Sequence, residues 1–184
     1  MIETGSIHGG RSGRVRYTSV AGDTSPQTLS IVAADGIDET PVARRIRIVP
    51  VPQAPQIGPV AAFAAIRGVA TPLAFAGTPF SDPDAARAPS RRLTATLTVA
   101  DGAITARSGG GVVVGGTPRE RTFTGTLVDL NRFFTNSAPG VAYTAMAAGS
   151  GSRPLGIMLS KRVADAGGLE RTLSAMAWSS INVA

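Results

Sequence analysis

Strict alternation over residues 93–99 is the sequence feature that most constrains the fold. Apolar residues alternate there with threonines, in the order Leu-Thr-Ala-Thr-Leu-Thr-Val. This period of two is typical of a strand with one buried face. An Asp-Gly pair at 101–102 ends the strand, and a glycine-rich run at 108–116 separates it from similar alternation at 122–125. The pattern predicts an all-β sandwich of antiparallel strands.

A short helix is expected directly after the second alternating stretch. Thr126-Leu127-Val128-Asp129 has the spacing of a capping box, in which Thr126 accepts from the amide of Asp129 and the Asp129 carboxylate reaches back. This spacing predicts a helix near 127–134.

Composition agrees with a β protein and narrows the functional classes. The 184 residues include 22 glycines and 13 prolines, and only 16% are charged, which suits many short strands joined by turns. Cysteine is absent, which leaves the redox compartment open. No apolar run approaches the roughly 20 residues of a membrane helix, and no secretory signal is visible at the start of the sequence. We therefore expect no membrane insertion.

The net charge of +6 comes almost entirely from arginine, because Lys161 is the only lysine. The arginines are scattered in small groups, and no basic element carries interleaved aromatic residues, so nucleic-acid binding is disfavoured. A solvated, scattered basic surface is the favoured interpretation. The candidates for contact with an acidic partner are Arg11, Arg14, Arg16, Arg119 and Arg121.

Enzymatic function is not expected, because the usual catalytic residues are missing. His8 is the only histidine and lies in a glycine-rich stretch, which leaves little for His-centred catalysis. The glycine-rich run at 108–116 lacks the Gly-Lys-Ser/Thr ending of a phosphate loop.

Three segments are predicted along the chain. Residues 1–27 have the composition of a flexible arm, 28–56 form a partial β-repeat followed by a proline-rich linker, and 57–184 form a complete β-domain. The partial repeat reads as a hairpin with a long connection through 38–41, and a similar hairpin pattern recurs at 155–183. Because an isolated hairpin is marginal in water, residues 28–51 either pair with another chain by strand addition or fold onto 57–184. The sequence leaves both alternatives open.

The order of these features resembles the cadherin-like, immunoglobulin-like repeats of large bacterial surface adhesins. The resemblance covers 57–184 and is carried by the strand at 93–99, the Asp-Gly turn, the phrase Phe-Thr-Gly-Thr-Leu-Val-Asp-Leu-Asn at 123–131, and Gly-Val-Ala-Tyr-Thr at 140–144. It implies an immunoglobulin/cadherin-like antiparallel sandwich. It also implies calcium as a cofactor, with Asp82 and Asp84 as the candidate ligands.

The calcium hypothesis competes with a simpler interpretation. Family members bind calcium through an acidic linker as well as an acidic pair, and the linker at 51–55 here carries no carboxylate. Asp82-Pro83-Asp84 then reads as a turn whose carboxylates accept local backbone amides. The sequence favours the turn.

The only tryptophan, Trp178, falls in the last predicted strand. A core anchor is the favoured role for it, and an exposed binding residue is the alternative.

Two functions from different classes follow. The resemblance implies a non-catalytic module on a cell surface or in the extracellular space, attached through its N-terminal arm, with protein partners or carbohydrate as ligands and loops such as 107–121 and 136–139 on display. The alternative is a structural virion protein, a capsid decoration or head-fibre subunit held by its own copies or by a larger assembly.

Overall fold

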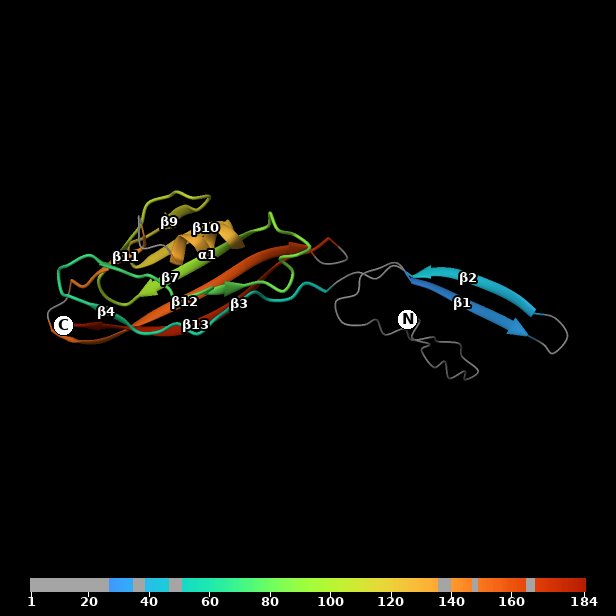
Figure 1. Cartoon of the computed structure of the whole chain (residues 1–184), viewed down its shortest axis with the longest axis horizontal. Coiled ribbons are helices and arrows are strands. Elements are labelled where there is room, and N and C mark those ends of the chain that lie inside the picture. The colour runs from blue at the N-terminus through green and yellow to red at the C-terminus, as the bar shows by residue number, and fades with distance from the viewer. Residues whose placement is uncertain (1–26, 35–38, 47–50, 136–139, 147–148, 165–167) are drawn as a thin grey trace. The chain divides into compact units, whose positions relative to one another are not determined.

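Two compact units make up the chain, Met1–Val51 and Pro52–Ala184 (Figure 1). The computed structural model describes the backbone at 27–34 and 39–46, and backbone and side chains at 51–135, 140–146, 149–164 and 168–184. Within these residues the protein is mostly β, with antiparallel pairs predominating and one short helix. The expected all-β class is confirmed. The predicted arm lies, up to residue 26, outside the described residues.

The first unit contains a β-hairpin. Strands β1 (Gln27–Ala34) and β2 (Glu39–Ile46) pair antiparallel along their whole length. The predicted hairpin is confirmed, but the expected long connection through 38–41 is wrong, since β2 begins at Glu39 and includes Pro41 opposite Val32. Among the described residues this sheet has two strands. Such a pair is at best marginally stable on its own in water.

The main sheet of the second unit has six strands in the order β4-β13-β12-β7-β10-β9. All neighbours are antiparallel except β4 and β13, which pair in parallel. The strands are β4 (Phe63–Ala65), β7 (Arg92–Val99), β9 (Val113–Gly116), β10 (Glu120–Thr126), β12 (Gly151–Ala164) and β13 (Glu170–Val183).

Strands β12 and β13 form a second hairpin, of 14 residues on each side, which runs through the length of the unit in Figure 1. The predicted C-terminal hairpin is therefore confirmed as an element. Strand β7 lies beside β12, and its alternation is also confirmed, because Leu93, Ala95, Leu97 and Val99 are all buried. These apolar side chains define the inner face of the main sheet.

Two smaller sheets complete the second unit. One has the order β5-β11-β8, from β5 (Thr71–Pro72), β11 (Ala142–Thr144) and β8 (Ala103–Thr105). The other pairs β3 (Gln56–Ile57) with β6 (Phe80–Ser81). Since β3 pairs with β6 and β4 pairs with β13, the chain passes from one sheet to another within residues 56–65.

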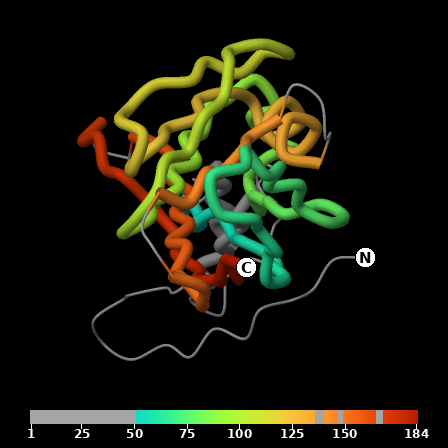
Figure 2. Tube along the Cα trace, turned by 90° about the vertical axis from the view of Figure 1, so that its left-hand side faces the viewer, coloured from blue at the N-terminus to red at the C-terminus, as the bar shows by residue number. Residues whose placement is uncertain are grey.

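Helix α1 (Leu127–Thr135) occupies the predicted place and begins with the predicted cap. The amide of Asp129 donates to Oγ1 of Thr126 over 3.2 Å, and that hydroxyl donates to the Asp129 carboxylate over 2.7 Å. The Asp129 amide and the Thr126 hydroxyl thus both have a hydrogen-bond partner at the start of the helix. In the end-on view of Figure 2, the helix lies on the opposite side of the unit from the red strand β13.

All six phenylalanines of the chain meet in the core beneath the inner face. Phe134 of α1 is central, with ring centroids 4.9 Å from Phe123, 5.0 Å from Phe75 and 5.2 Å from Phe80. Edge-on aromatic contacts of this kind add about 0.5–1.5 kcal/mol each beyond the burial of area. The helix is therefore fixed on the sheet by its C-terminal turn as well as by its cap.

The glycine-rich run is partly ordered by contacts with this helix. Gly111 has φ +84°, and a Cβ there would lie 2.5 Å from the carboxyl group of Asp129. Its neighbour Val112 is buried. The prediction that 107–121 is an exposed loop is therefore wrong in part, because strand β9 and the buried Val112 lie within it.

Candidate functional site

An ion cluster joins the predicted calcium ligands to the only lysine of the chain. Nζ of Lys161 lies 2.5 Å from Oδ1 of Asp82 and 2.8 Å from Oδ2 of Asp84. The Lys161 side chain is completely buried, and both carboxylates are nearly so. Lys161 reaches them because odd-numbered residues of β12 point to the inner face. The ammonium therefore contacts both carboxylates and compensates one of their two negative charges.

The same cluster fixes the start of the second unit. The amide of Gln53 donates to Oδ2 of Asp84 over 2.9 Å, and the amide of Asp84 donates to Oδ1 of Asp82 over 3.0 Å. The second bond is the local carboxylate-to-amide contact that the turn interpretation predicted. Arg87 adds a longer ion pair to Asp84, at 3.7 Å.

These contacts shift the titration of one aspartate. Burial alone raises the pKa of Asp84, but the hydrogen bonds from Lys161 and from the Gln53 amide, with the charges of Lys161 and Arg87, hold the pKa of that carboxyl below its ordinary value. Asp84 is therefore an ionised, structural group at neutral pH.

Calcium binding by Asp82 and Asp84 stays a prediction. The Lys161 ammonium would compete with calcium for both carboxylates. A calcium ion needs six to eight oxygen ligands, and here the ammonium of Lys161 contacts both carboxylates. In the part of the chain that the structure describes, no group of three or more acidic, histidine or cysteine side chains is placed to hold a metal. Of the other acids that tertiary structure could bring near this pair, Asp35, Asp38 and Asp165 lie outside the described residues, and only the backbone of Glu39 is described.

The candidate arginines separate into two groups. Arg11, Arg14 and Arg16 lie outside the described residues. Arg119 is exposed, whereas Arg121 is half-buried and donates from Nε to the Ile104 carbonyl over 2.9 Å and from Nη1 to the Gly116 carbonyl over 3.2 Å. Arg121 therefore holds loop backbone together, and Arg119 is the one of this pair whose side chain is exposed to a partner.

Opposite the core, the outer face of the main sheet carries rows of hydroxyl groups. The register places Thr94 beside Thr124 and Ser160, and Thr96 beside Thr122. We call this surface the hydroxyl face and define it by Thr94, Thr96, Thr98, Thr122, Thr124, Ser160, Thr172 and Ser174, of which Thr96 is buried. Oγ1 of Thr94 and Oγ1 of Thr124 are 3.1 Å apart, and the Ser160 hydroxyl donates to the Thr94 carbonyl over 3.3 Å.

The hydroxyl face is hollowed. A shallow cavity of about 540 Å³ lies over the four central strands, within the size range of ligand pockets. The residues that line it are Arg92, Thr94, Thr96, Thr124, Met158, Ser160, Lys161, Arg162 and Thr172. None of them is an acid or a histidine. The lining can donate and accept hydrogen bonds and bind an anion, but it contains no carboxylate or imidazole that could serve as a general base.

Trp178 lies on this outer surface, so the expectation of a core anchor is wrong. Its side chain is 68% exposed, and Met176 beside it is 65% exposed. The reason is strand parity, since the buried residues of β13 are Ile181 and Val183, and Trp178 points the other way. The six-membered ring reaches across to β12, where a Cβ on Gly156 would lie 3.2 Å from Cζ3 of Trp178.

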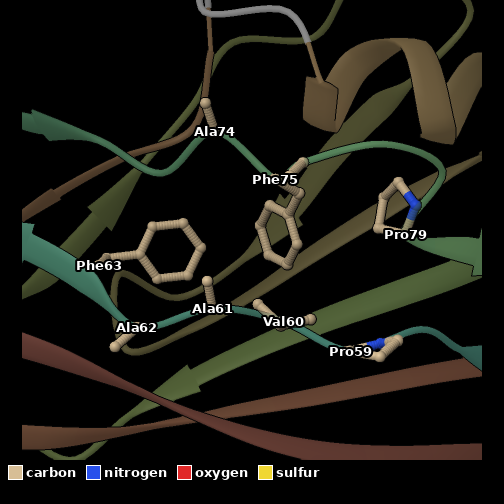
Figure 3. A pocket seen from close by; sticks show the side chains of 9 residues that line it. Pro59, Val60, Ala61, Ala62, Phe63, Ala74, Phe75 and Pro79 are labelled. Carbon is tan, nitrogen blue, oxygen red and sulfur yellow. The ribbon is translucent and has the colours of Figure 1, made fainter.

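The structure also holds a small apolar cavity away from the hydroxyl face. It measures about 90 Å³ and lies between the segment that leads into β4 and the segment before β6 (Figure 3). Phe63 and Phe75 face each other across it with ring centroids 5.3 Å apart. Its size suits one side chain rather than a small-molecule ligand.

Sequence reasoning missed the hydroxyl face as a site and named neither Arg92 nor Arg162 as part of one. The available signal was the pair of Thr-x-Thr-x-Thr patterns, at 94–98 and 122–126. Only the antiparallel register brings them side by side, and a one-residue slip would have separated them.

A scan against protein-family models found no match, and a search of curated proteins found none either. Among the described residues, no helix has the length and apolar character that crossing a bilayer requires.

Proposed function

We propose that this chain is a non-catalytic structural and interaction protein that is displayed on an exterior surface and recognises its ligand on the hydroxyl face. The observation that carries the proposal is Trp178. Large apolar side chains are normally withdrawn from water, and an indole 68% exposed on an otherwise hydroxyl-rich sheet marks a contact surface. A partner that covers Trp178 and Met176 gains apolar burial without any rearrangement of the sheet.

In this proposal the second unit is an immunoglobulin-like or cadherin-like sandwich. Two features support it. The inner face of the main sheet is covered by α1 and by the smaller sheets, and the chain changes sheets between β3 and β4 before β4 joins β13 in parallel. A rigid two-layer unit of this kind can hold the hydroxyl face in a fixed shape.

The first unit is proposed to attach the protein to something larger. The two-stranded sheet of β1 and β2 supports this role, because such a hairpin gains stability when another strand pairs with it. The same observation favours the second candidate function, a structural subunit of a virion, in which the hairpin pairs within an assembly. On a cell surface, the hairpin would instead pair with a neighbouring domain.

Retention of the purified full-length chain on immobilised polysaccharides and proteins tests the proposal. We expect retention by at least one class of ligand, and we expect Trp178→Ala to reduce it at least about tenfold. Val113→Ala, at an exposed valine of edge strand β9, is the matched control and should have no effect. Retention that Trp178→Ala leaves unchanged would show that recognition lies elsewhere on the molecule.

A further inference from the structure

Two arginines, Arg92 and Arg162, lie at one end of the hydroxyl face. Leu93 of β7 pairs with Lys161 of β12, so the next position along places Arg92 and Arg162 opposite each other on the outer face. Both are exposed. Among the described residues neither forms an ion pair. Like charges on opposed strand positions are unfavourable, and a bound anion removes that cost.

One of the two guanidinium groups is already oriented. Nη2 of Arg92 donates to the Thr124 carbonyl over 2.7 Å, which holds the side chain over β10 and is its one hydrogen bond to another described residue. Arg162 lies beside Thr172 on the neighbouring strand. Guanidinium groups on two neighbouring strands offer N–H donors of the kind that bind a carboxylate.

The middle of the face carries hydroxyl groups beside the side chains of Met158 and Met176. Threonine and serine hydroxyls each donate and accept hydrogen bonds, which matches a ligand whose own groups also do both. Sugar hydroxyls have this character. The hollow of about 540 Å³ lies over this part of the sheet and is open on one side.

The exposed indole lies at the other end. Trp178 is opposite Gly156, and the seven residues from Gly156 to Arg162 on β12 span about 20 Å. This distance accommodates several sugar units of an extended chain. The apolar face of a pyranose ring can pack on the indole, as aromatic side chains bind ligands that are apolar on one side and polar on the other.

We propose that the hydroxyl face binds an acidic oligosaccharide, with a sugar ring on Trp178, sugar hydroxyls on the threonine and serine rows, and a carboxylate at Arg92 and Arg162. This inference rests on the proposed function and names its ligand class. A nucleic acid fits less well, because it needs repeated stacking and repeated phosphate contacts, and the face has one indole and one pair of guanidinium groups.

The experiment is a calorimetric titration of the full-length chain with hexasaccharides of galacturonic, mannuronic and glucuronic acid. The fully methyl-esterified galacturonate hexamer is the neutral counterpart of one of them. We expect at least one acidic hexamer to bind and the matched neutral chain to bind at least about tenfold more weakly. Raising the salt concentration should reduce the difference in affinity between the acidic and the neutral hexamer, because exposed charges are screened.

Variants separate the two ends of the face. Arg92→Gln with Arg162→Gln should reduce acidic binding to the level of the neutral hexamer, and Trp178→Ala should weaken both. The control pair Arg67→Gln with Arg107→Gln keeps the same net charge change at exposed positions that do not line the hollow and should bind normally. Unfolding curves of every variant establish that each is folded.

Each other outcome contradicts a particular statement. Equal loss in both double variants would mean that only net charge matters. Binding that depends on Trp178 but not on the carboxylate would leave the proposed function standing and overturn the acidic ligand. Binding confined to single-stranded oligonucleotides or to proteins, and lost on Trp178→Ala, would overturn the oligosaccharide while keeping the face. Absence of binding by all acidic hexamers would overturn this inference, and the proposed function would then depend on its own retention test.

Discussion

Lys161 and Arg162 are neighbours in sequence, yet they lie on opposite faces of β12 in opposite electrostatic environments. The Lys161 ammonium is buried and contacts two carboxylates within 2.8 Å. Arg162 is exposed, and the described residues give it no carboxylate. The difference arises only from the period of two in a strand. Neighbouring residues of one strand can therefore serve different roles, Lys161 as a structural cation in the core and Arg162 as a cation available to a ligand on the surface.

The largest effect is expected from removing the buried cation. Lys161→Met leaves two carboxylates in the core without their ammonium, so the free energy of unfolding should fall by about 3–5 kcal/mol. Urea unfolding followed by circular dichroism measures this. Arg162→Met is the matched change on the outer face and should stay within about 0.5 kcal/mol of the parent chain. Similar losses in both variants would remove the distinction between the two faces.

The alternation in β7 allows the inner and outer faces to be compared at uncharged residues. Leu97→Ala removes a completely buried side chain from the inner face and should cost about 2–5 kcal/mol. Thr98→Ala, one residue along and exposed, should change stability by no more than about 0.5 kcal/mol. A large cost at Thr98 in thermal unfolding would mean that the outer face is covered in the isolated protein.

Acid should weaken the inner cluster before it affects the outer face. The pKa of Asp84 is lower in the folded state than its ordinary value of 3.8, so its contribution to stability is fully present above that value. It is lost as the pH falls through 3.8 towards the lower pKa of the folded state. Unfolding measured from pH 6 to pH 2 should show this loss, and Asp84→Asn should flatten the curve. An equally steep curve in Asp84→Asn would assign the acid sensitivity to other carboxylates.

The smallest change in stability is expected at the most exposed aromatic residue. Trp178→Ala should alter the free energy of unfolding by about 0.5 kcal/mol or less, because the indole is mostly in water already. The same substitution should weaken ligand binding to the hydroxyl face at least about tenfold. A loss of several kcal/mol in chemical unfolding would instead return Trp178 to the structural role that the sequence first indicated.

Local patterns predicted much of the fold. The strand at 93–99, the cap at Thr126 and Asp129, and both hairpins follow from alternation, spacing and turn residues, and the structure confirms them. Side-chain direction in β13 was not predictable in this way. Its residues 173–178 are small, apolar or hydroxylated on both faces, so the sequence does not mark which side Trp178 occupies.

The candidate site depended on register, which local patterns do not encode. Asp82 and Asp84 were identified as a pair, but their contact with Lys161 joins positions 77 and 79 residues apart. Arg92 and Arg162 meet for the same reason, because β7 and β12 are neighbours only in the folded sheet. Long-range strand order decided which charges are compensated and which remain available to a ligand.

The central claim is that the outer face of the main sheet is the recognition surface, and fluorescence of Trp178 tests it most directly. The chain has a single tryptophan, so quenching by acrylamide reports on this face alone. We predict efficient quenching in the free protein and a saturable decrease in quenching as an acidic hexasaccharide is added, with the same midpoint as calorimetry. Binding seen by calorimetry with quenching of Trp178 unchanged at saturation would contradict the account.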